Sequence, residues 1–206
     1  MDEMTGLRER KKAATRLALH EAALRLAAEH GPDGVTVEAI ADAANVSRRT
    51  FSNYFSNKEE ALFHGDTVRL RRLLQLVHER PVDEPPWTAL SRAAERFTPE
   101  AFGGRDRSWL PRRRRLRGHP GLAAHQVAAY TAIERELATE LAPRLTGADV
   151  ALRARLLAAT FLAILRVAIQ HWIDHPDDQL LDTVRAALAE VAPPPADPDR
   201  TSAADD

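Results

Sequence analysis

The chain has 206 residues, of which 44% are hydrophobic, and it carries 29 lysines and arginines against 30 aspartates and glutamates. This length allows one large domain or two modest ones. The net charge of −1 gives no whole-chain preference for nucleic acid, and the absence of cysteine excludes disulfides, thiolate nucleophiles and zinc–thiolate sites. The polar, basic start does not fit a signal peptide, so a cytoplasmic protein is expected.

The first predicted element is a long helix over residues 8–30, preceded by a frayed start at residues 1–7. Apolar residues recur on one face at helical spacing, and the HGPDG segment then ends the helix. Basic residues crowd its first turns: Arg8, Arg10, Lys11, Lys12 and Arg16. They either contact a DNA backbone or form a solvated helix end.

A short helix is predicted after Thr36, whose hydroxyl can cap the first turn. One face of this helix is apolar, formed by Val37, Ile40, Ala41 and Ala44. Asn45 suits a tight turn, because asparagine tolerates left-handed backbone angles. Ser47 is the next predicted cap. The chain is therefore expected to turn sharply between two short helices.

The second short helix has a polar, basic face. Phe51 and Phe55 lie four residues apart and are predicted to point inward together. Polar side chains remain outside or beside them: Arg48, Arg49, Thr50, Ser52, Asn53 and Tyr54. Arginine and asparagine can read base edges, and hydroxyl groups can bind phosphates. The pattern is that of a helix-turn-helix, which places its second helix in the DNA major groove.

Another helix is predicted over residues 57–79, because Ser56 and Glu59 have the spacing of a capping box. Lys58 would lie at its start, where it could contact a phosphate beside the helix N-terminus. The predicted DNA-contacting residues are Thr36, Ser47, Arg48, Arg49, Thr50, Asn53, Tyr54 and Lys58.

Residues 1–64 resemble the N-terminal domain of TetR-family transcriptional regulators. The resemblance is carried by the GPDG turn, the capping Thr36, the IA–A–VS run, the YF pair and the K-E-x-x-L segment. It implies a three-helix DNA-binding domain, an all-helical ligand-binding and dimerisation domain, and a role as a ligand-released repressor. The later arginine run with HPGL and the terminal W-x-x-x-P helix pair resemble the mycofactocin-regulator branch, which implies an acyl-CoA-responsive sensor.

The rest of the chain is predicted to be a helical bundle. Helices are expected over 87–97, across the arginine run, and over 120–145, 149–173 and 178–192, with an irregular segment at 97–109. The proline- and aspartate-rich end has nothing to bury and is predicted to be disordered. The predicted domains are a DNA-binding domain (1–56), a ligand-binding and dimerisation domain (57–192, with 57–79 as connector) and a tail (193–206).

The helix predicted over 149–173 holds the most apolar stretch, residues 156–169, interrupted only by Thr160 and Arg166. This stretch is shorter than the roughly 20 residues of a membrane span, so no membrane insertion is expected. A helix that is apolar all round must be buried all round. The same helix of a second copy is the simplest partner, and a homodimer would suit a palindromic operator. The alternative is a core helix within one chain.

The candidate ligand contacts are Trp109, Arg113, Tyr130 and Phe161, with Phe97 and Phe102 as further aromatic candidates. These aromatic residues line an apolar cavity or belong to an ordinary core. The arginine run, Arg112–Arg115 and Arg117, either binds an anion such as the phosphates of a CoA-type ligand or forms a solvated basic face. His171 and His175 are interpreted as a polar helix end, not as a metal pair.

No nucleophile elbow, Walker loop or dinucleotide-binding fingerprint is present, so neither catalysis nor a cofactor is expected. The sequence predicts an all-α, dimeric DNA-binding regulator, released from a palindromic operator by a small hydrophobic or acyl-CoA-like ligand. Two alternatives remain: an all-helical ligand-binding or enzyme bundle without specific DNA binding, and a constitutive architectural DNA-binding protein without a ligand.

Overall fold

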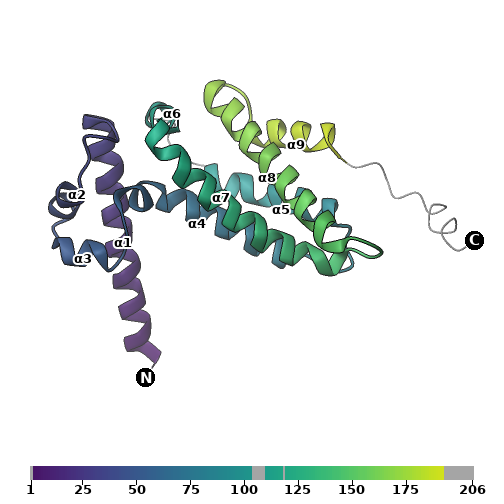
Figure 1. The fold of residues 1–206 in the computed structure, drawn as a ribbon, viewed down its shortest axis with the longest axis horizontal. Helices are drawn as coiled ribbons and strands as arrows, with labels where there is room; N and C mark the ends of the chain where they lie inside the picture. The colour runs from purple at the N-terminus through teal and green to yellow at the C-terminus, as the bar shows by residue number, and fades with distance from the viewer. Residues whose placement is uncertain (1, 104–109, 118, 193–206) are drawn as a thin grey trace, which may run out of the picture.

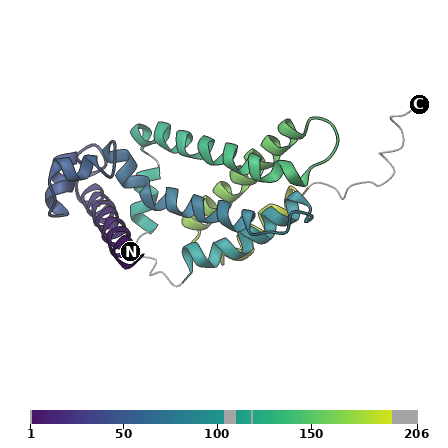
Figure 2. The same cartoon turned by 90° about the horizontal axis from the view of Figure 1, so that it is seen from below.

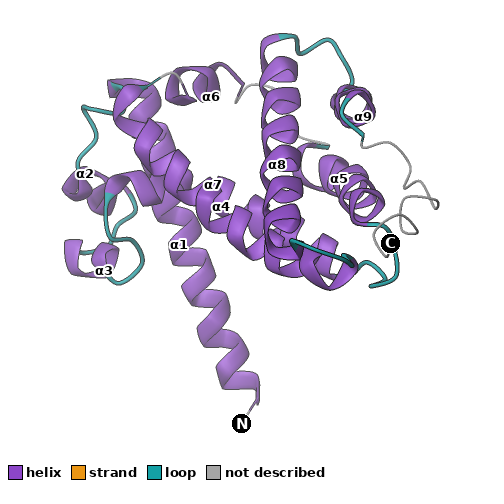
Figure 3. Ribbon diagram, turned by 45° about the vertical axis from the view of Figure 1, so that its right-hand side comes forward, coloured by secondary structure: helices purple, strands orange, loops and turns teal. Residues whose placement is uncertain are grey.

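The computed structural model describes residues 2–103, 110–117 and 119–192. Over these ranges the protein is helical and contains no strand, which confirms the predicted all-α class (Figures 1 and 3). A small group of N-terminal helices lies at one end of an elongated molecule, and a larger helical bundle occupies the rest (Figure 1). The predicted disordered tail, residues 193–206, lies outside the described residues.

The N-terminal group, here called the reading head, comprises α1 (Asp2–His30), α2 (Val37–Ala43), α3 (Arg48–Ser52) and the first turns of α4 (Lys58–His78). Its core encloses Leu19, Ile40 and Phe51 from three different helices, as the apolar spacing predicts. The predicted fraying of residues 2–7 is wrong. Helix α1 already runs from Asp2 and projects beyond the head (Figure 3), because extending a nucleated helix is much easier than starting one.

Helix α4 joins the reading head to the larger bundle. Its first turns bury Leu62 and Phe63 in the core of the head, and its later turns bury Leu73 and Leu76 in the core of the bundle. Since one helix contributes to both cores, a change in the tilt of α4 necessarily changes how the two parts are placed. The sequence predicts this connector to within one residue at each end.

The cap of α4 differs from the prediction by one position. The side-chain oxygen of Asn57, not Ser56, accepts a hydrogen bond from the Glu60 backbone N–H at 2.8 Å. The Glu60 carboxylate in turn accepts from the Ser56 N–H at 2.7 Å. The segment S-N-K-E-E offers two overlapping pairs with capping spacing, and the predicted Ser56–Glu59 box was the wrong one of the two.

The bundle, here called the sensor domain, continues through α5 (Pro86–Phe102), α6 (Leu110–Arg117), α7 (Pro120–Leu141), the 3-10 helix η2 (Ala142–Arg144), α8 (Val150–Asp174) and α9 (Leu180–Glu190). Helix α7 packs against α4 and α8, and α9 packs against α5 and α8 (Figure 2). The predicted order of helices is confirmed, with ends that shift by a few residues.

Helix α5 is longer than predicted. It passes through Pro99 and ends at Phe102, so the expected irregular structure over residues 97–102 is wrong. Phe97 and Ala101 are buried on its inner face, and this packing holds the last turn despite the missing proline N–H. The remainder of the segment, including Trp109, lies outside the described residues apart from Gly103.

Helix α8 has two apolar faces. The inner face buries Phe161, Leu165 and Trp172 in the sensor core. The outer face leaves Leu152 and Leu156 more than half exposed, at 58% and 57%. By length and composition α8 is the one described helix that could cross a membrane, a test that a core helix of a soluble protein also passes. Among the described residues, this outer face is left exposed to solvent.

Candidate functional site

The two caps predicted for the helix-turn-helix are present. The Thr36 hydroxyl accepts from the Ala39 N–H at 3.1 Å, and the Ser47 hydroxyl accepts from the Thr50 N–H at 3.0 Å. Between the two helices, Asn45 has a φ of 54°, in the left-handed region where asparagine is tolerated. These local contacts fix the start of α3 and the angle at which it leaves the turn.

The outer face of α3 carries the predicted polar groups. Arg48, Arg49 and Asn53 are exposed, and Thr50 is half-buried with its hydroxyl 2.9 Å from that of Ser47. Arg48 forms an ion pair with Glu38 of α2 at 3.0 Å, and both side chains are largely exposed. Exposed pairs of this kind contribute about 0–1 kcal/mol, so a phosphate group could take the place of Glu38 at little cost.

Tyr54 lies at the edge of the reading head, with its ring packed against the head core. The guanidinium of Arg16 lies 5.7 Å from the centre of this ring and 5.9 Å from that of Phe55. Arg16, which the sequence assigned to a basic arm, thus ties α1 to the segment after α3 by cation–π contact. The other basic residues of that arm, from Arg8 to Lys12, are exposed on the projecting part of α1 (Figure 3).

Lys58 has a structural role that the sequence did not predict. Its ammonium donates to the carbonyl oxygens of Pro32 and Val35 at 3.0 Å and to that of Asp33 at 3.4 Å. A lysine ammonium has three N–H donors, and all three are used here. In this structure Lys58 therefore holds the α1–α2 turn, and its predicted contact with a phosphate stays a prediction.

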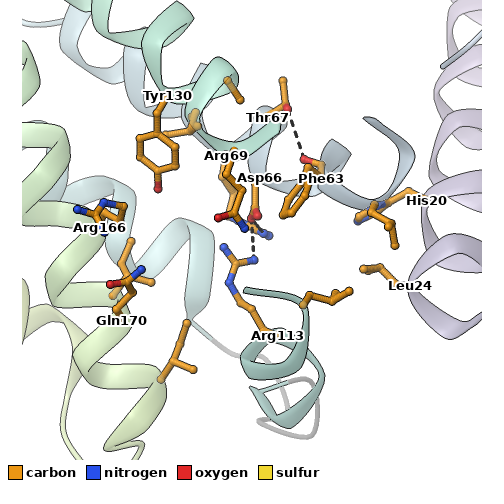
Figure 4. A pocket seen from close by; sticks show the side chains of 17 residues that line it. His20, Leu24, Phe63, Asp66, Thr67, Arg69, Arg113, Tyr130, Arg166 and Gln170 are labelled. Carbon is orange, nitrogen blue, oxygen red and sulfur yellow. Dashed lines mark hydrogen bonds and ion pairs between the residues drawn. The ribbon is translucent and has the colours of Figure 1, made fainter. Parts of the chain in front are cut away.

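A cavity of about 210 Å³ lies in the sensor domain, next to the seam with the reading head (Figure 4). Its walls come from α1, α4, α6, α7 and α8. The lining includes six polar or charged side chains from four helices: Asp66, Arg69, Arg113, Tyr130, Arg166 and Gln170. A smaller neighbouring pocket is lined by Phe97 and Phe102. The site thus combines an apolar space with a concentrated set of charges.

Asp66 lies at the centre of these charges. Its carboxylate accepts hydrogen bonds from Arg69, one turn along α4, and lies 2.6 Å from the Arg113 guanidinium of α6 (Figure 4). Burial raises the pKa of the Asp66 carboxyl, but the two guanidiniums outweigh burial and bring the pKa below its usual value. Asp66 is therefore ionised at neutral pH, and it ties α6 to α4.

Tyr130 of α7 and Arg166 and Gln170 of α8 lie on the side of the cavity away from the reading head (Figure 4). Burial, and then the nearby Asp66 carboxylate, raise the pKa of the Tyr130 hydroxyl, which stays protonated and can donate a hydrogen bond. Arg166 forms no ion pair with any residue that the structure describes. This wall offers donors to a ligand that enters.

The predicted ligand contacts are only partly brought together. Arg113 and Tyr130 line the cavity as predicted. Phe161 does not, because it is fully buried in the sensor core, so its assignment to the cavity wall is corrected. Trp109 lies outside the described residues, and so do the side chains of Arg112, Arg115 and Arg117.

Within the arginine run, Arg114 donates to the Ile173 carbonyl and thereby caps the end of α8.

His20, Asp66, Arg69 and Arg166 were not predicted from the sequence as cavity residues. The only signals were a charged residue inside the apolar stretch of α8, at Arg166, and an acid three residues before an arginine in α4. His20 donates from Nδ1 to the Ala61 carbonyl at 2.7 Å, and burial lowers the pKa of its imidazole. It therefore lines the cavity as a neutral group.

Three further contacts join the sensor domain to the reading head. Leu122, at the start of α7, is buried in the core of the head, and Leu116 of α6 packs against the same core. His119, between these helices, lies 3.1 Å from the Asp33 carboxylate in the α1–α2 turn. The corner between α6 and α7 is thus in direct contact with the reading head.

His171 and His175 form a helix end, as predicted. Their rings stack at 4.3 Å, and His175 Nδ1 donates to the His171 carbonyl at 3.0 Å. In the described parts of the chain no three histidine or acidic side chains are grouped to hold a metal ion.

A capped helix-turn-helix, joined by one continuous helix to a helical domain with a cavity, defines a regulator that carries its reading head and its sensor in one chain. Comparison with known proteins agrees. Residues 19–64 match the family of bacterial regulatory proteins called tetR, and residues 84–195 match the MftR C-terminal domain. The chain belongs to the TetR family of DNA-binding transcriptional regulators, with an MftR-type C-terminal domain.

Two relatives cover most of the chain. The HTH-type transcriptional regulator TcmR of Streptomyces glaucescens is 32% identical over 182 residues, which is 85% of this chain and 80% of TcmR. MftR of Mycobacterium tuberculosis, named for the regulation of mycofactocin biosynthesis, is 28% identical over 186 residues, 88% of this chain and 91% of MftR.

Among solved structures, the fold resembles that of Thermus thermophilus FadR, a TetR-family transcriptional repressor crystallised with lauroyl-CoA. The TM-score is 0.51 at 23% identity, over 89% of this chain and 97% of FadR. At this identity the likeness concerns the fold alone.

Proposed function

We propose that this protein is a cytoplasmic, homodimeric repressor that leaves a palindromic operator when a small hydrophobic or acyl-CoA-like ligand enters the sensor cavity. The observation that carries the proposal is the course of α4, whose first turns belong to the reading head and whose Asp66 and Arg69 line the cavity. We place the functional boundary at residues 56/57, so that α4 acts as the connector of the 57–192 domain.

The DNA-contacting surface is the outer face of α3 with its two caps. Arg49 and Asn53 are exposed and have the donor groups that recognise guanine and adenine edges. Arg48, Thr50, Tyr54 and the capping hydroxyls of Thr36 and Ser47 supply phosphate contacts around them. Lys58 supports this surface by holding the α1–α2 turn.

The dimer forms through the outer face of α8 together with α9. Leu152, Leu156 and Val167 are each more than half exposed on α8, at 58%, 57% and 53%. Packing the same face of a second copy against them removes this apolar surface from water. Two reading heads related by a two-fold axis can then contact half-sites about 34–36 Å apart, on one side of the duplex.

Release from DNA is a shift between two arrangements of the heads. A ligand that binds better to the cavity in the non-DNA-binding arrangement favours that arrangement by its difference in affinity. In this dimer, α4 and the corner between α6 and α7 connect the cavity to the head, through Asp66 on one side and Leu122 on the other.

The direct test is a gel shift with the purified protein and the DNA upstream of its own coding region, at one stated salt concentration, with and without lauroyl-CoA. The proposal predicts a specific complex that the ligand dissociates. Arg135→Ala, an exposed change on α7, serves as the matched control and should bind like the parent. A specific complex that no ligand in an acyl-CoA and fatty-acid series dissociates would refute the release step. Binding to no specific site in a genome-wide selection would refute the regulator itself.

A further inference from the structure

The charges around the cavity indicate a particular chemical class of effector. We propose that the effector is a compact apolar acid, whose carboxylate binds Arg166 and takes Arg113 from Asp66. In the absence of ligand, Asp66 then occupies the position on Arg113 that the ligand carboxylate would take. This inference rests on the proposed function, since it specifies the ligand of the same cavity.

The charged side chains that line the cavity are not balanced. The described lining carries one carboxylate, Asp66, and three guanidiniums, those of Arg69, Arg113 and Arg166. His20 adds no charge, because burial keeps its imidazole neutral. Of the three arginines, Arg166 is solvent-exposed and has no ion-pair partner among the residues described. A cleft lined with an excess of one sign attracts a ligand of the opposite sign, so this lining favours an anion.

Asp66 is in contact with two guanidinium groups. Arg69 and Arg113 share its single carboxylate, with Arg113 at 2.6 Å. Guanidinium groups bind any carboxylate with the same fork geometry, so a ligand carboxylate can substitute for Asp66 on Arg113 while Asp66 keeps Arg69. The exchange replaces one charged pair by an equivalent one, and it adds the negative charge that Arg166 lacks. A neutral ligand gains neither of these contacts.

The cavity is small, and part of its wall is apolar. The cavity of about 210 Å³ exceeds the roughly 150 Å³ of an engineered cavity that binds benzene, but it is smaller than the roughly 300–1,000 Å³ of sites for drug-sized ligands. Leu24, Phe63, Leu70 and Ile169 supply apolar surface to the same cavity. The space suits a single ring or a short alkyl chain that ends in a carboxylate, and the nucleotide part of a CoA ester does not fit inside it.

Exchange at Arg113 also has a direct consequence for the reading head. The Arg113–Asp66 pair joins α6 to α4, and Leu116, one turn further along α6, packs against the core of the head. When a ligand takes Arg113, α6 is no longer held to α4 by that pair. The same event that binds the anion therefore removes one contact of a helix that also packs against the reading head.

The test uses the intact protein and three probes of equal chain length: sodium octanoate, octanamide and octanoyl-CoA, with 4-phenylbutyrate as a ring-bearing acid. Calorimetric titration and thermal melting report binding without requiring DNA. The inference predicts that the two acids bind and raise the melting temperature, and that octanamide binds at least about tenfold more weakly, because it lacks the charge-assisted contacts.

Substitutions in the cavity test which side chains contact the carboxylate of octanoate. Arg166→Gln should weaken octanoate binding about tenfold or more, whereas the matched change Arg155→Gln, on an exposed part of the same helix, should leave it unchanged. Asp66→Asn, which removes the competing carboxylate, should strengthen octanoate binding several-fold. If Asp66→Asn does not fold, Arg166→Gln and Arg155→Gln still decide the question.

Equal binding of octanoate and octanamide, or no binding of either acid at millimolar concentration, would overturn the inference. Binding of octanoyl-CoA without binding of octanoate would also overturn it, while leaving the proposed acyl-CoA-released repressor intact. Octanoate that binds through Arg166 without affecting the DNA complex would support this inference and refute the proposed release step, so the two failures are distinguishable.

Discussion

The reading head and the sensor cavity obtain their geometry in different ways. In the head, the capping hydroxyls of Thr36 and Ser47 bond to backbone N–H groups three residues along the chain. In the cavity, Asp66 of α4 is held by Arg113 of α6, and Tyr130 and Arg166 come from two further helices. The starts of α2 and α3 are thus set by local contacts, whereas the cavity exists only when distant helices are packed together. A ligand can rearrange the second kind of structure more easily than the first.

The largest expected effect comes from removing a core side chain of the head. Phe51 is 1% exposed, and Phe51→Ala should lower the free energy of unfolding by about 3–5 kcal/mol. Because α4 belongs to both cores, urea unfolding should remain one transition for the head and the sensor domain. Leu7→Ala, on an exposed part of α1, should change stability by no more than about 0.5 kcal/mol. Two separated transitions in the parent protein would show that the two regions are independent.

A substitution of Lys58 tests whether this residue positions the α1–α2 turn or contacts DNA. Lys58→Met removes the three hydrogen bonds to the α1–α2 turn and should lower the free energy of unfolding by about 1–3 kcal/mol. If Lys58 only positions the turn, the salt dependence of operator binding should keep its slope. A slope reduced by about 1 would instead identify a phosphate contact.

The caps of the head should each contribute less. Thr36→Ala removes the acceptor for the Ala39 N–H and should lower the free energy of unfolding by about 1 kcal/mol. Thr36→Ser keeps the hydroxyl and should retain most of the stability. Equal losses in the two variants would mean that the threonine methyl group, not the cap, stabilises this turn.

The smallest expected effect is a dependence of stability on pH at the seam between the two regions. Burial lowers the pKa of His20 below its ordinary value of 6.5. Burial, followed by repulsion from a protonated His20 and from Arg16, lowers the pKa of His64. The unfolded chain therefore takes up protons that the folded chain does not, so stability should be full above about pH 7 and fall as the pH drops through 6.5. Urea midpoints between pH 5.5 and 7.5 measure this.

A substitution of His20 tests whether this residue causes the dependence of stability on pH. His20→Gln can still donate to the Ala61 carbonyl, and it should reduce the dependence of the urea midpoint on pH. His171→Gln, at the exposed end of α8, should not change it. An unchanged dependence in His20→Gln would assign the effect to other groups.

Features that depend on neighbouring residues can be predicted from the sequence, whereas features that depend on the packing of distant helices cannot. Caps and apolar periodicities act over three or four residues, so Thr36, Ser47, Phe51 and the course of α4 can be predicted from spacing alone. The cavity cannot be predicted in this way, because the pairing of Asp66 with Arg113 depends on how α4 and α6 cross. Phe161 has the same apolar surroundings in the sequence whether it faces a core or a cavity, and only packing decides between them.

The contacts of Lys58, within the reading head, could not be predicted from the sequence either. Its position at the start of α4 suggests a phosphate contact, but three carbonyl groups of the α1–α2 turn, more than 20 residues earlier in the chain, surround its ammonium. The local pattern correctly placed the residue and could not identify its partners.

The most direct test of the account is the affinity of Arg49→Ala for the operator, measured by fluorescence anisotropy at fixed salt beside the parent and Arg135→Ala. Arg49 is exposed on α3, so the account predicts a loss of about 1–3 kcal/mol in DNA binding with an unchanged melting temperature, and no loss for Arg135→Ala. Equal affinity of Arg49→Ala and the parent for the operator, with both proteins folded, would contradict the assignment of α3 as the DNA-reading helix.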